Sequence, residues 1–283
     1  MLLCIIVKVK EGMNMKNICE KQNELLHALL ELDHEIVGVR FLHHETDYKN
    51  NSAQEILYKM PYCVMVKSAL AGHRIKVKKE NFGCMAAARA LGFVAPKASF
   101  LEGKDGYSFG IYKDLETAKC SSGNITLLDS SHYGMTIAPL DQCKAAPDII
   151  IMVTKPYNAM RMTQAYTYSF GNQNPFKMGG LQAMCSETTA YPMKTGNLNI
   201  SMLCAGTRNL CHWKEEELAI GFPYRKLEAI LTGLLQTLNP LERNHKKQII
   251  QDKFEALGIA PIPIQMNRNY DDNLYEFGKN GRR

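Results

Sequence analysis

Nine cysteines are the residues of this 283-residue chain with the clearest capacity for chemistry. A thiolate is both a nucleophile and a good ligand for soft metals. No two of these cysteines are spaced as C-x-x-C, which excludes the close-spaced motifs of zinc ribbons, thioredoxin-like redox pairs and bacterial ferredoxins. Any metal site must therefore be assembled from cysteines that lie far apart in the sequence.

The opening residues lack the pattern of a signal peptide. Their apolar run is short, no basic residue precedes it, and no small-residue cleavage site follows. No stretch reaches the roughly eighteen apolar residues of a membrane span. We therefore expect a cytoplasmic protein without a membrane partner, whose thiols stay reduced. The odd cysteine count also argues against complete disulfide pairing.

Local context separates four cysteines from the other five. Cys63 begins a predicted helix, Cys84 precedes an alanine-rich helix, and Cys204 ends an apolar strand before a glycine-containing turn. Cys185 follows a flexible glycine pair. Functional sites are commonly built at such junctions, and a helix start lowers the pKa of a thiol. The remaining cysteines are interpreted as packing or surface thiols: Cys4, Cys19, Cys120, Cys143 and Cys211.

The first hypothesis is an iron–sulfur site. Four thiolates match the ligand count of a [4Fe–4S] cluster, and two of them lie in each half of the chain. Arg208 and Gly206, in the turn after the last of the four, would form an adjacent anion-binding site. A zinc ion held by the same four thiolates is the metal alternative.

Two further hypotheses need no metal. In one, an anion pocket is built from the turn at 204–208, from Gly179 and Gly180, and from the helix start after Pro156, with Lys155 and Arg161 as flanking cations. In the other, Cys84 or Cys204 is the nucleophile of a thiol enzyme. The sequence leaves open whether the protein is an enzyme.

The net charge of the chain indicates which classes of partner it could bind. The net charge of +6 is mild, and the basic residues form no nucleic-acid motif, so we expect no nucleic-acid partner. An anionic small molecule or a redox partner protein would fit a basic chain with a cysteine site. The oligomeric state is left open.

The elements that must position these residues alternate between strands and helices, which predicts an α/β or α+β fold with a mixed sheet flanked by helices. We expect one globular unit over 17–258, with two halves that meet near 139–147, an N-terminal extension at 1–16 and a surface tail at 259–283. The predicted strands are 36–42, 75–78, 107–112, 135–138, 149–153 and 200–203. The predicted helices and helical turns are 17–32, 53–60, 63–71, 84–91, 114–119, 157–169, 215–218, 224–238 and 241–257.

Three segments resemble a known family. The run from Pro147 to Met160 is similar to a "P-D-hydrophobic … P-x-x-A-M" pattern, and residues 204–223 are similar to "C-x-G-x-R … E-L … G-x-P". Residues 36–41 stand where the family has "P-V-A-V-K-F", with Ile36 and Arg40 as departures. The pattern is that of domain-of-unknown-function family 169 and covers about residues 20–240. The resemblance implies a single α/β-type unit of prokaryotic, often anaerobe-associated character. It also implies that Cys63, Cys84, Cys185 and Cys204 stand at positions where members of the family tend to carry cysteine.

Overall fold

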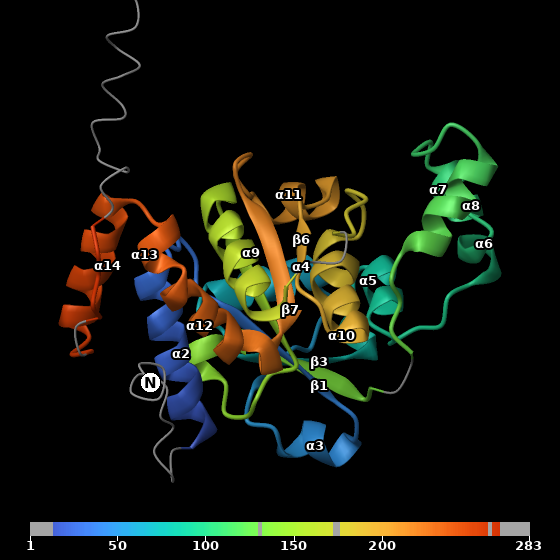
Figure 1. Cartoon of the computed structure of the whole chain (residues 1–283). Helices are drawn as coiled ribbons and strands as arrows, with labels where there is room; N and C mark the ends of the chain where they lie inside the picture. Colours follow the sequence, from blue (N-terminus) through green and yellow to red (C-terminus); the bar gives the residue numbers. More distant parts are fainter. Residues whose placement is uncertain (1–13, 130–131, 172–175, 260–261, 267–283) are drawn as a thin grey trace, which may run out of the picture.

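Segments rich in isoleucine and valine form the centre of one mixed sheet. The computed structural model describes residues 14–129, 132–171, 176–259 and 262–266. In them, seven strands pair in the order β2-β3-β4-β1-β5-β7-β6, and the pair β2–β3 is parallel while the others are antiparallel (Figure 1). The strands are β1 Val37–Leu42, β2 Gln54–Glu55, β3 Ile75–Lys78, β4 Gly134–Pro139, β5 Ile149–Thr154, β6 Asn199–Ser201 and β7 Leu218–Pro223.

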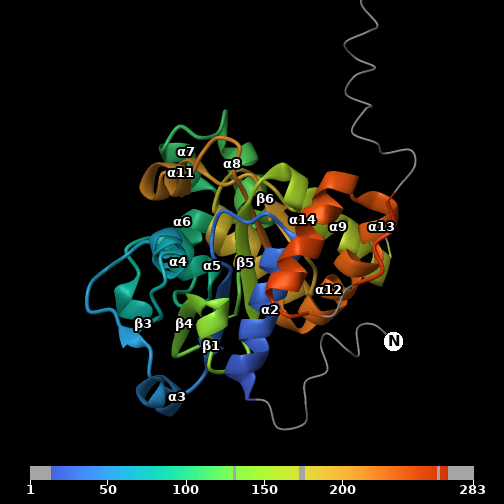
Figure 2. The same cartoon turned by 90° about the vertical axis from the view of Figure 1, so that its left-hand side faces the viewer.

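Both faces of this sheet are apolar because both are covered by helices. Along β5, Ile150 and Met152 face one hydrophobic cluster, whereas Ile149 and Ile151 face the other. Successive side chains of a strand point to opposite faces of the sheet. A continuous run of apolar residues therefore contributes to the hydrophobic clusters on both faces. The quarter-turn view shows the sheet between the two helical layers (Figure 2).

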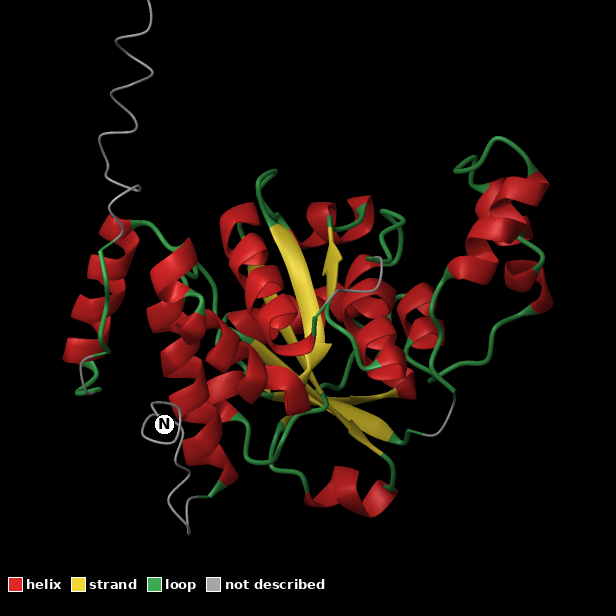
Figure 3. Cartoon of the chain, in the orientation of Figure 1, coloured by secondary structure: helices red, strands yellow, loops and turns green. Residues whose placement is uncertain are grey.

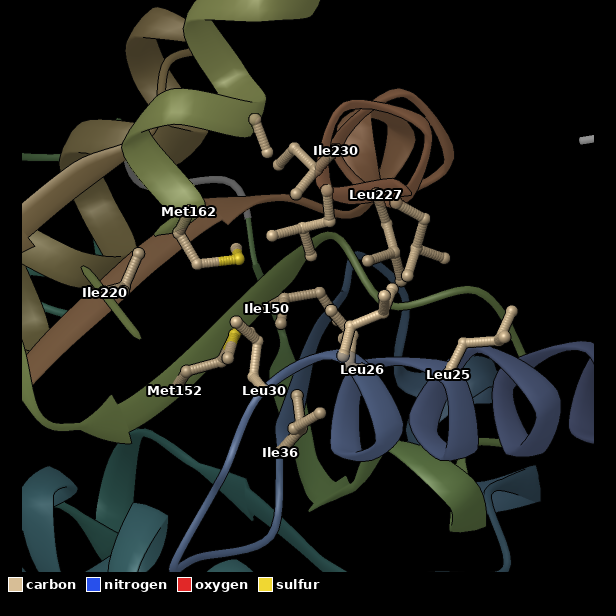
Figure 4. Close-up of a cluster of buried hydrophobic side chains, with 14 of the residues drawn as sticks. Leu25, Leu26, Leu30, Ile36, Ile150, Met152, Met162, Ile220, Leu227 and Ile230 are labelled. Atoms are coloured by element: carbon tan, nitrogen blue, oxygen red, sulfur yellow. The ribbon is translucent and has the colours of Figure 1, made fainter. Parts of the chain in front are cut away.

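The first helical layer carries the N-terminal and C-terminal helices. Leu26, Met162, Leu227 and Ile230 from three of these helices meet over the sheet (Figure 4). A Cβ on Gly233 would lie 2.2 Å from a backbone oxygen of the facing helix, so the two central helices of the layer pack closely. The helices are α2 Met15–Leu29, α9 Pro156–Phe170, α12 Leu227–Gln236, α13 Leu238–Leu241 and α14 Asn244–Ala256.

The second helical layer is made of shorter helices on the opposite face. It contains a π-helix, η3, which replaces the regular α-helical pattern over eight residues. These elements are α4 Tyr62–Leu70, α5 Met85–Ala90, η3 Ala183–Ala190, α10 Tyr191–Thr195 and α11 Ala205–Cys211. Outside both layers lie α3 Glu45–Asn50 and a group of three helices that stands away from the body: α6 Ala98–Leu101, α7 Lys104–Ser108 and α8 Leu115–Asn124 (Figures 1 and 3).

The fold class predicted from the sequence is confirmed. The two halves of the chain contribute separate parts of the sheet, β2-β3-β4-β1 and β5-β7-β6, and they join where Val37 pairs with Ile151. Asp148, at the junction, accepts a hydrogen bond of 2.7 Å from the Phe41 backbone N–H. The segment near 139–147 therefore links two parts of one continuous sheet.

Three local predictions were wrong. Residues 53–60 contain the short strand β2 and no helix, because the Gln54 amide donates to the Arg74 carbonyl and the Ile56 amide donates to the Lys76 carbonyl of β3. The predicted strand 107–112 begins in α7 and ends in turns. The helical turn expected at 215–218 is a turn at 215–216 only, and Leu218 already begins β7, a strand that the sequence analysis missed. The expected extension lies largely outside the described residues.

No helix in the described parts of the chain combines the length and the apolar character that crossing a membrane requires.

Candidate functional site

Four cysteines line one cavity in the second helical layer. The cavity has a volume of about 340 Å³ and lies between α4, α5, η3 and α11. Its cysteines are Cys63, Cys84, Cys185 and Cys204, one from each of these elements, and its other walls are mostly apolar. The four residues separated by local context in the sequence are therefore brought to the same cavity by the fold.

Each of these cysteines stands at the start of a helical segment. Cys63 is the second residue of α4, and Cys84 and Cys204 are the N-cap residues of α5 and α11. Cys185 is the third residue of η3. Backbone N–H groups at helix starts are available to anions, and the amides of Cys63 and Val64 donate to the Cys63 sulfur. The cavity is thus surrounded by backbone donors.

A backbone bridge brings the starts of α4 and α5 together. Met60 pairs with Phe82 just ahead of the two helices, and the Gly83 N–H donates to the Met60 carbonyl at 2.9 Å. A Cβ on Gly83 would lie 3.2 Å from the Met60 backbone, so a side chain there would crowd this contact. The bridge fixes Cys63 and Cys84, which follow it closely, on one side of the cavity.

Close packing on the sheet holds the π-helix that carries Cys185. A Cβ on Gly221 of β7 would lie 2.0 Å from the Thr188 carbonyl oxygen, so glycine lets η3 lie directly on the strand. The Thr189 hydroxyl donates to the Met184 carbonyl at 2.6 Å and lies 3.0 Å from the Tyr62 hydroxyl of α4. π-Helices are uncommon and frequently occur at functional sites.

Burial and neighbouring thiols act together on Cys185. Burial raises the pKa of its thiol well above the ordinary value, and Cys84 and Cys204 raise it further. A buried thiolate flanked by two others needs a nearby positive charge. Among the described residues, no three histidine, cysteine, aspartate or glutamate side chains form a group that could hold a metal ion.

A fifth cysteine contacts the site. The thiol of Cys211, at the end of α11, interacts with that of Cys63, and this interaction is the main reason that the pKa of Cys63 is lowered to about 7. The pKa of Cys211 is raised for the same reason and by burial. The Thr207 hydroxyl donates to the Cys211 sulfur at 3.9 Å and also interacts with Cys63. The sequence analysis had assigned Cys211 to packing, although its seven-residue spacing from Cys204 places both on one helix face.

The sequence analysis also missed two polar residues beside the cavity. Arg89 of α5 interacts electrostatically with Cys84 and Cys185, and its guanidinium stacks on the Phe100 ring at 3.5 Å from the centroid. Gln182 lines the cavity in a left-handed conformation with φ 54°, and its side-chain oxygen is buried without a hydrogen-bond partner in the described structure. Neither residue stands in a motif.

The predicted anion-binding residues are dispersed, and only Gly206 lines the cavity. Arg208 donates to three backbone carbonyls, those of Met202, Lys214 and Glu217, and so holds the loop after α11. Gly179 lines a separate cavity of about 280 Å³ on the other side of η3 and donates to Glu187 at 2.6 Å. Gly180, its neighbour, has a positive φ of 67°.

The two flanking cations of the metal-free hypothesis lie elsewhere. Lys155 is 2.7 Å from a carboxylate oxygen of Asp33. The Nε of Arg161 is 3.1 Å from Glu242, and both side chains are almost completely buried in the first helical layer. Correcting that prediction, we find that the two cations are engaged by carboxylates and do not line the cysteine cavity, because α9 lies on the other face of the sheet.

The comparisons with known proteins agree with the resemblance seen in the sequence. Residues 25–233 match the family DUF169, which is described as uncharacterised ArCR. An uncharacterised protein of Methanocaldococcus jannaschii is 27% identical over 226 residues, which are 78% of this chain and 95% of that protein. No solved structure matches the chain.

Proposed function

Since the chain belongs to the DUF169 family, whose description names no activity, we propose a function from the cysteine cavity: it holds an iron–sulfur cluster of the [4Fe–4S] type. Cys63, Cys84, Cys185 and Cys204 are the four ligands. The observation that carries the proposal is that four separate elements each contribute one cysteine to a single cavity.

The arrangement of the thiols favours a cluster over a single ion. The four sulfurs around a zinc ion lie about 2.3 Å from one point and therefore crowd together. The ligands of a cubane cluster are instead held apart by a core of iron and sulfide. The four thiols line a cavity of about 340 Å³, and such a volume leaves room for a core of this kind.

The surroundings suit a negatively charged cluster. Backbone amides donate to the sulfurs of Cys63 and Cys185, and Arg89 supplies a positive charge near two of the thiols. Hydrogen bonds to the sulfurs, net charge and solvent exposure set the potential of such a cluster. The apolar side chains of Met184 and Leu210 would limit the access of water.

The proposed role is redox chemistry in the cytoplasm. The cluster would exchange electrons with a partner protein or act on an anionic small molecule bound beside it. Met85 and Leu210, on helices that border the cavity, are more than half exposed and provide an apolar rim for such a contact.

Anaerobic purification tests the proposal. We expect a brown protein with about four iron and four sulfide per chain. Serine variants of each proposed ligand should lose most of this content, because a hydroxyl is a poorer ligand for iron than a thiolate. Cys120→Ser is the matched control, since Cys120 is exposed on α8 and does not line the cavity.

Two results would contradict the proposal. Colourless protein without bound iron, obtained under strictly anaerobic conditions and after attempted reconstitution with iron and sulfide, would exclude a cluster. Stoichiometric zinc without sulfide would assign the same cavity to a zinc site.

A further inference from the structure

A second cavity lies on the other side of the π-helix from the four cysteines. It has a volume of about 280 Å³ and is lined by residues of α8, η3 and α10 and of the segment 176–181. No cysteine lines it, so its chemistry is independent of the proposed cluster. Two of its lining residues, Lys177 and Glu187, carry opposite charges, and they indicate the kind of ligand that the cavity could hold.

Glu187 is a buried carboxylate whose described hydrogen-bond donors are neutral. The side chain belongs to a residue that is 4% exposed, the Gly179 N–H donates to one of its oxygens at 2.6 Å, and the Ser201 hydroxyl donates to the other. The Ser201 oxygen itself accepts from the Leu203 N–H at 3.2 Å. Both carboxylate oxygens therefore act as acceptors, which is the pattern of the ionised form.

This buried carboxylate lacks a counter-charge. No lysine, arginine or histidine of the described residues forms a salt bridge with Glu187. A buried ion is costly unless it is paired with a charge of the opposite sign. A positively charged group that enters the cavity would supply that charge.

Lys177 is held near Glu187 but is not paired with it. The completely buried side chain of Asn199 accepts from the Lys177 N–H at 2.8 Å and donates to the Lys177 carbonyl at 2.9 Å. The same amide group donates to the Glu187 carbonyl at 2.9 Å. One side chain of β6 thus fixes the backbone of both charged residues, while their charged ends form no salt bridge with each other in the described structure.

Two opposite charges that line one cavity without neutralising each other can each bind one end of a zwitterion. We propose that this cavity binds a free amino acid with an apolar side chain, whose ammonium group pairs with Glu187 and whose carboxylate pairs with Lys177. Charge-assisted hydrogen bonds of this kind are short and strong. Phe176, Met178 and Leu181 line the same cavity and would contact the apolar side chain. The cavity is smaller than most that hold drug-sized ligands, which suits a single amino acid.

Isothermal titration calorimetry on the full-length protein tests the site. The probes are leucine, isoleucine, valine, methionine and phenylalanine, and we expect at least one of them to bind. The tightest binder is then compared with its analogue that lacks the amino group and with its analogue that lacks the carboxylate. Each analogue should bind at least about tenfold more weakly, because it leaves one charged residue without its partner.

Variants without the charges locate the site. Lys177→Met and Glu187→Gln should each raise the dissociation constant of the binder at least about tenfold. Lys119→Met is the matched control and should bind as the unmodified chain does, since Lys119 is exposed on α8 and does not line the cavity. Lys177 is only half-buried, so its variant keeps the test valid where Glu187→Gln does not fold.

Cys84→Ser separates this inference from the proposed function. The variant should lose the cluster and still bind the amino acid with unchanged affinity. If no form of the chain binds iron but the amino acid binds, the proposed function fails and this inference stands. If iron and sulfide are present but no probe binds, only this inference fails.

Absence of binding by all five probes at millimolar concentration would overturn the inference. So would binding that Lys177→Met and Glu187→Gln both leave unchanged, because the amino acid would then occupy another part of the molecule.

Discussion

Arg89 is the residue whose charge bears most directly on the proposed cluster. Its guanidinium stacks on Phe100, its Nε is buried without a hydrogen-bond partner in the described structure, and it interacts with Cys84 and Cys185. Burial lowers the pKa of Arg89, but an arginine remains protonated at any physiological pH. It therefore supplies a fixed positive charge where the cluster would be negative.

Removing this charge should lower the midpoint potential of the cluster. The reduced cluster is more negative than the oxidised one, so it loses more stabilisation in Arg89→Met, and we expect a fall on the order of tens of millivolts. Arg89→Lys keeps the charge and should shift the potential less. A redox titration followed by electron paramagnetic resonance measures both. An unchanged or higher potential in Arg89→Met, at equal iron content, would show that Arg89 does not act on the cluster.

At the scale of the elements, the site depends on how η3 lies on the sheet. The π-helix places Cys185 in the cysteine cavity and the next two residues, Ser186 and Glu187, in the polar cavity on its other side. It can approach β7 so closely because Gly221 has no side chain. The position of Cys185 in the cavity therefore depends on the absence of a side chain at residue 221.

Gly221→Ala should move η3 or β7 and weaken both the fold and the site. The added Cβ would lie 2.0 Å from the Thr188 carbonyl oxygen, and over-packing of this kind costs about 1–3 kcal/mol. We expect a lower denaturation midpoint and a lower iron content per chain. Gly123→Ala is the control, because nothing lies within 4 Å of a Cβ at this position in α8. Equal stability of the two variants would refute the importance of the close contact.

At the scale of the whole molecule, the two helical layers differ: one contains the cysteine cavity and the other contains a buried ion pair. The layer on the cavity side carries the four cysteines that line the cavity. The opposite layer is held together by the buried ion pair of Arg161 and Glu242. The Tyr157 hydroxyl donates to Glu242 at 2.5 Å, and Arg161 donates to the Thr237 hydroxyl at 3.2 Å. This network joins α9 to the C-terminal helices and lies apart from the cysteine cavity.

Glu242→Gln should therefore destabilise the protein without affecting the cluster. The variant leaves the buried guanidinium of Arg161 without its counter-charge, which costs about 3–5 kcal/mol. The double variant with Arg161→Met should recover part of this loss, because no buried charge remains. Chemical denaturation and the iron content of the folded fraction are the measurements. Loss of iron from folded, stable protein would contradict this expectation and would show that the Arg161–Glu242 pair affects the cysteine cavity.

Local sequence patterns were sufficient for most of the regular elements. The strands β1, β3, β4 and β5 and the helices α2 and α9 were predicted because their hydrophobic spacing is regular and glycine or proline marks several of their ends. The prediction was wrong at β2, which is set by pairing with its neighbour, and no element was predicted at η3, which packs closely against Gly221. These two structures are determined by distant residues and leave no local periodicity.

The sequence by itself determined that this is an α/β chain of the DUF169 family with four cysteines at the ends of elements. Only the tertiary structure decided that the four line one cavity, that Cys211 interacts with Cys63, and that Arg161 and Lys155 lie elsewhere. The physical reason is that the start of a helix is encoded by its own residues. Which helix starts face each other depends on strand order and on which face of the sheet each helix covers, and local sequence does not specify either.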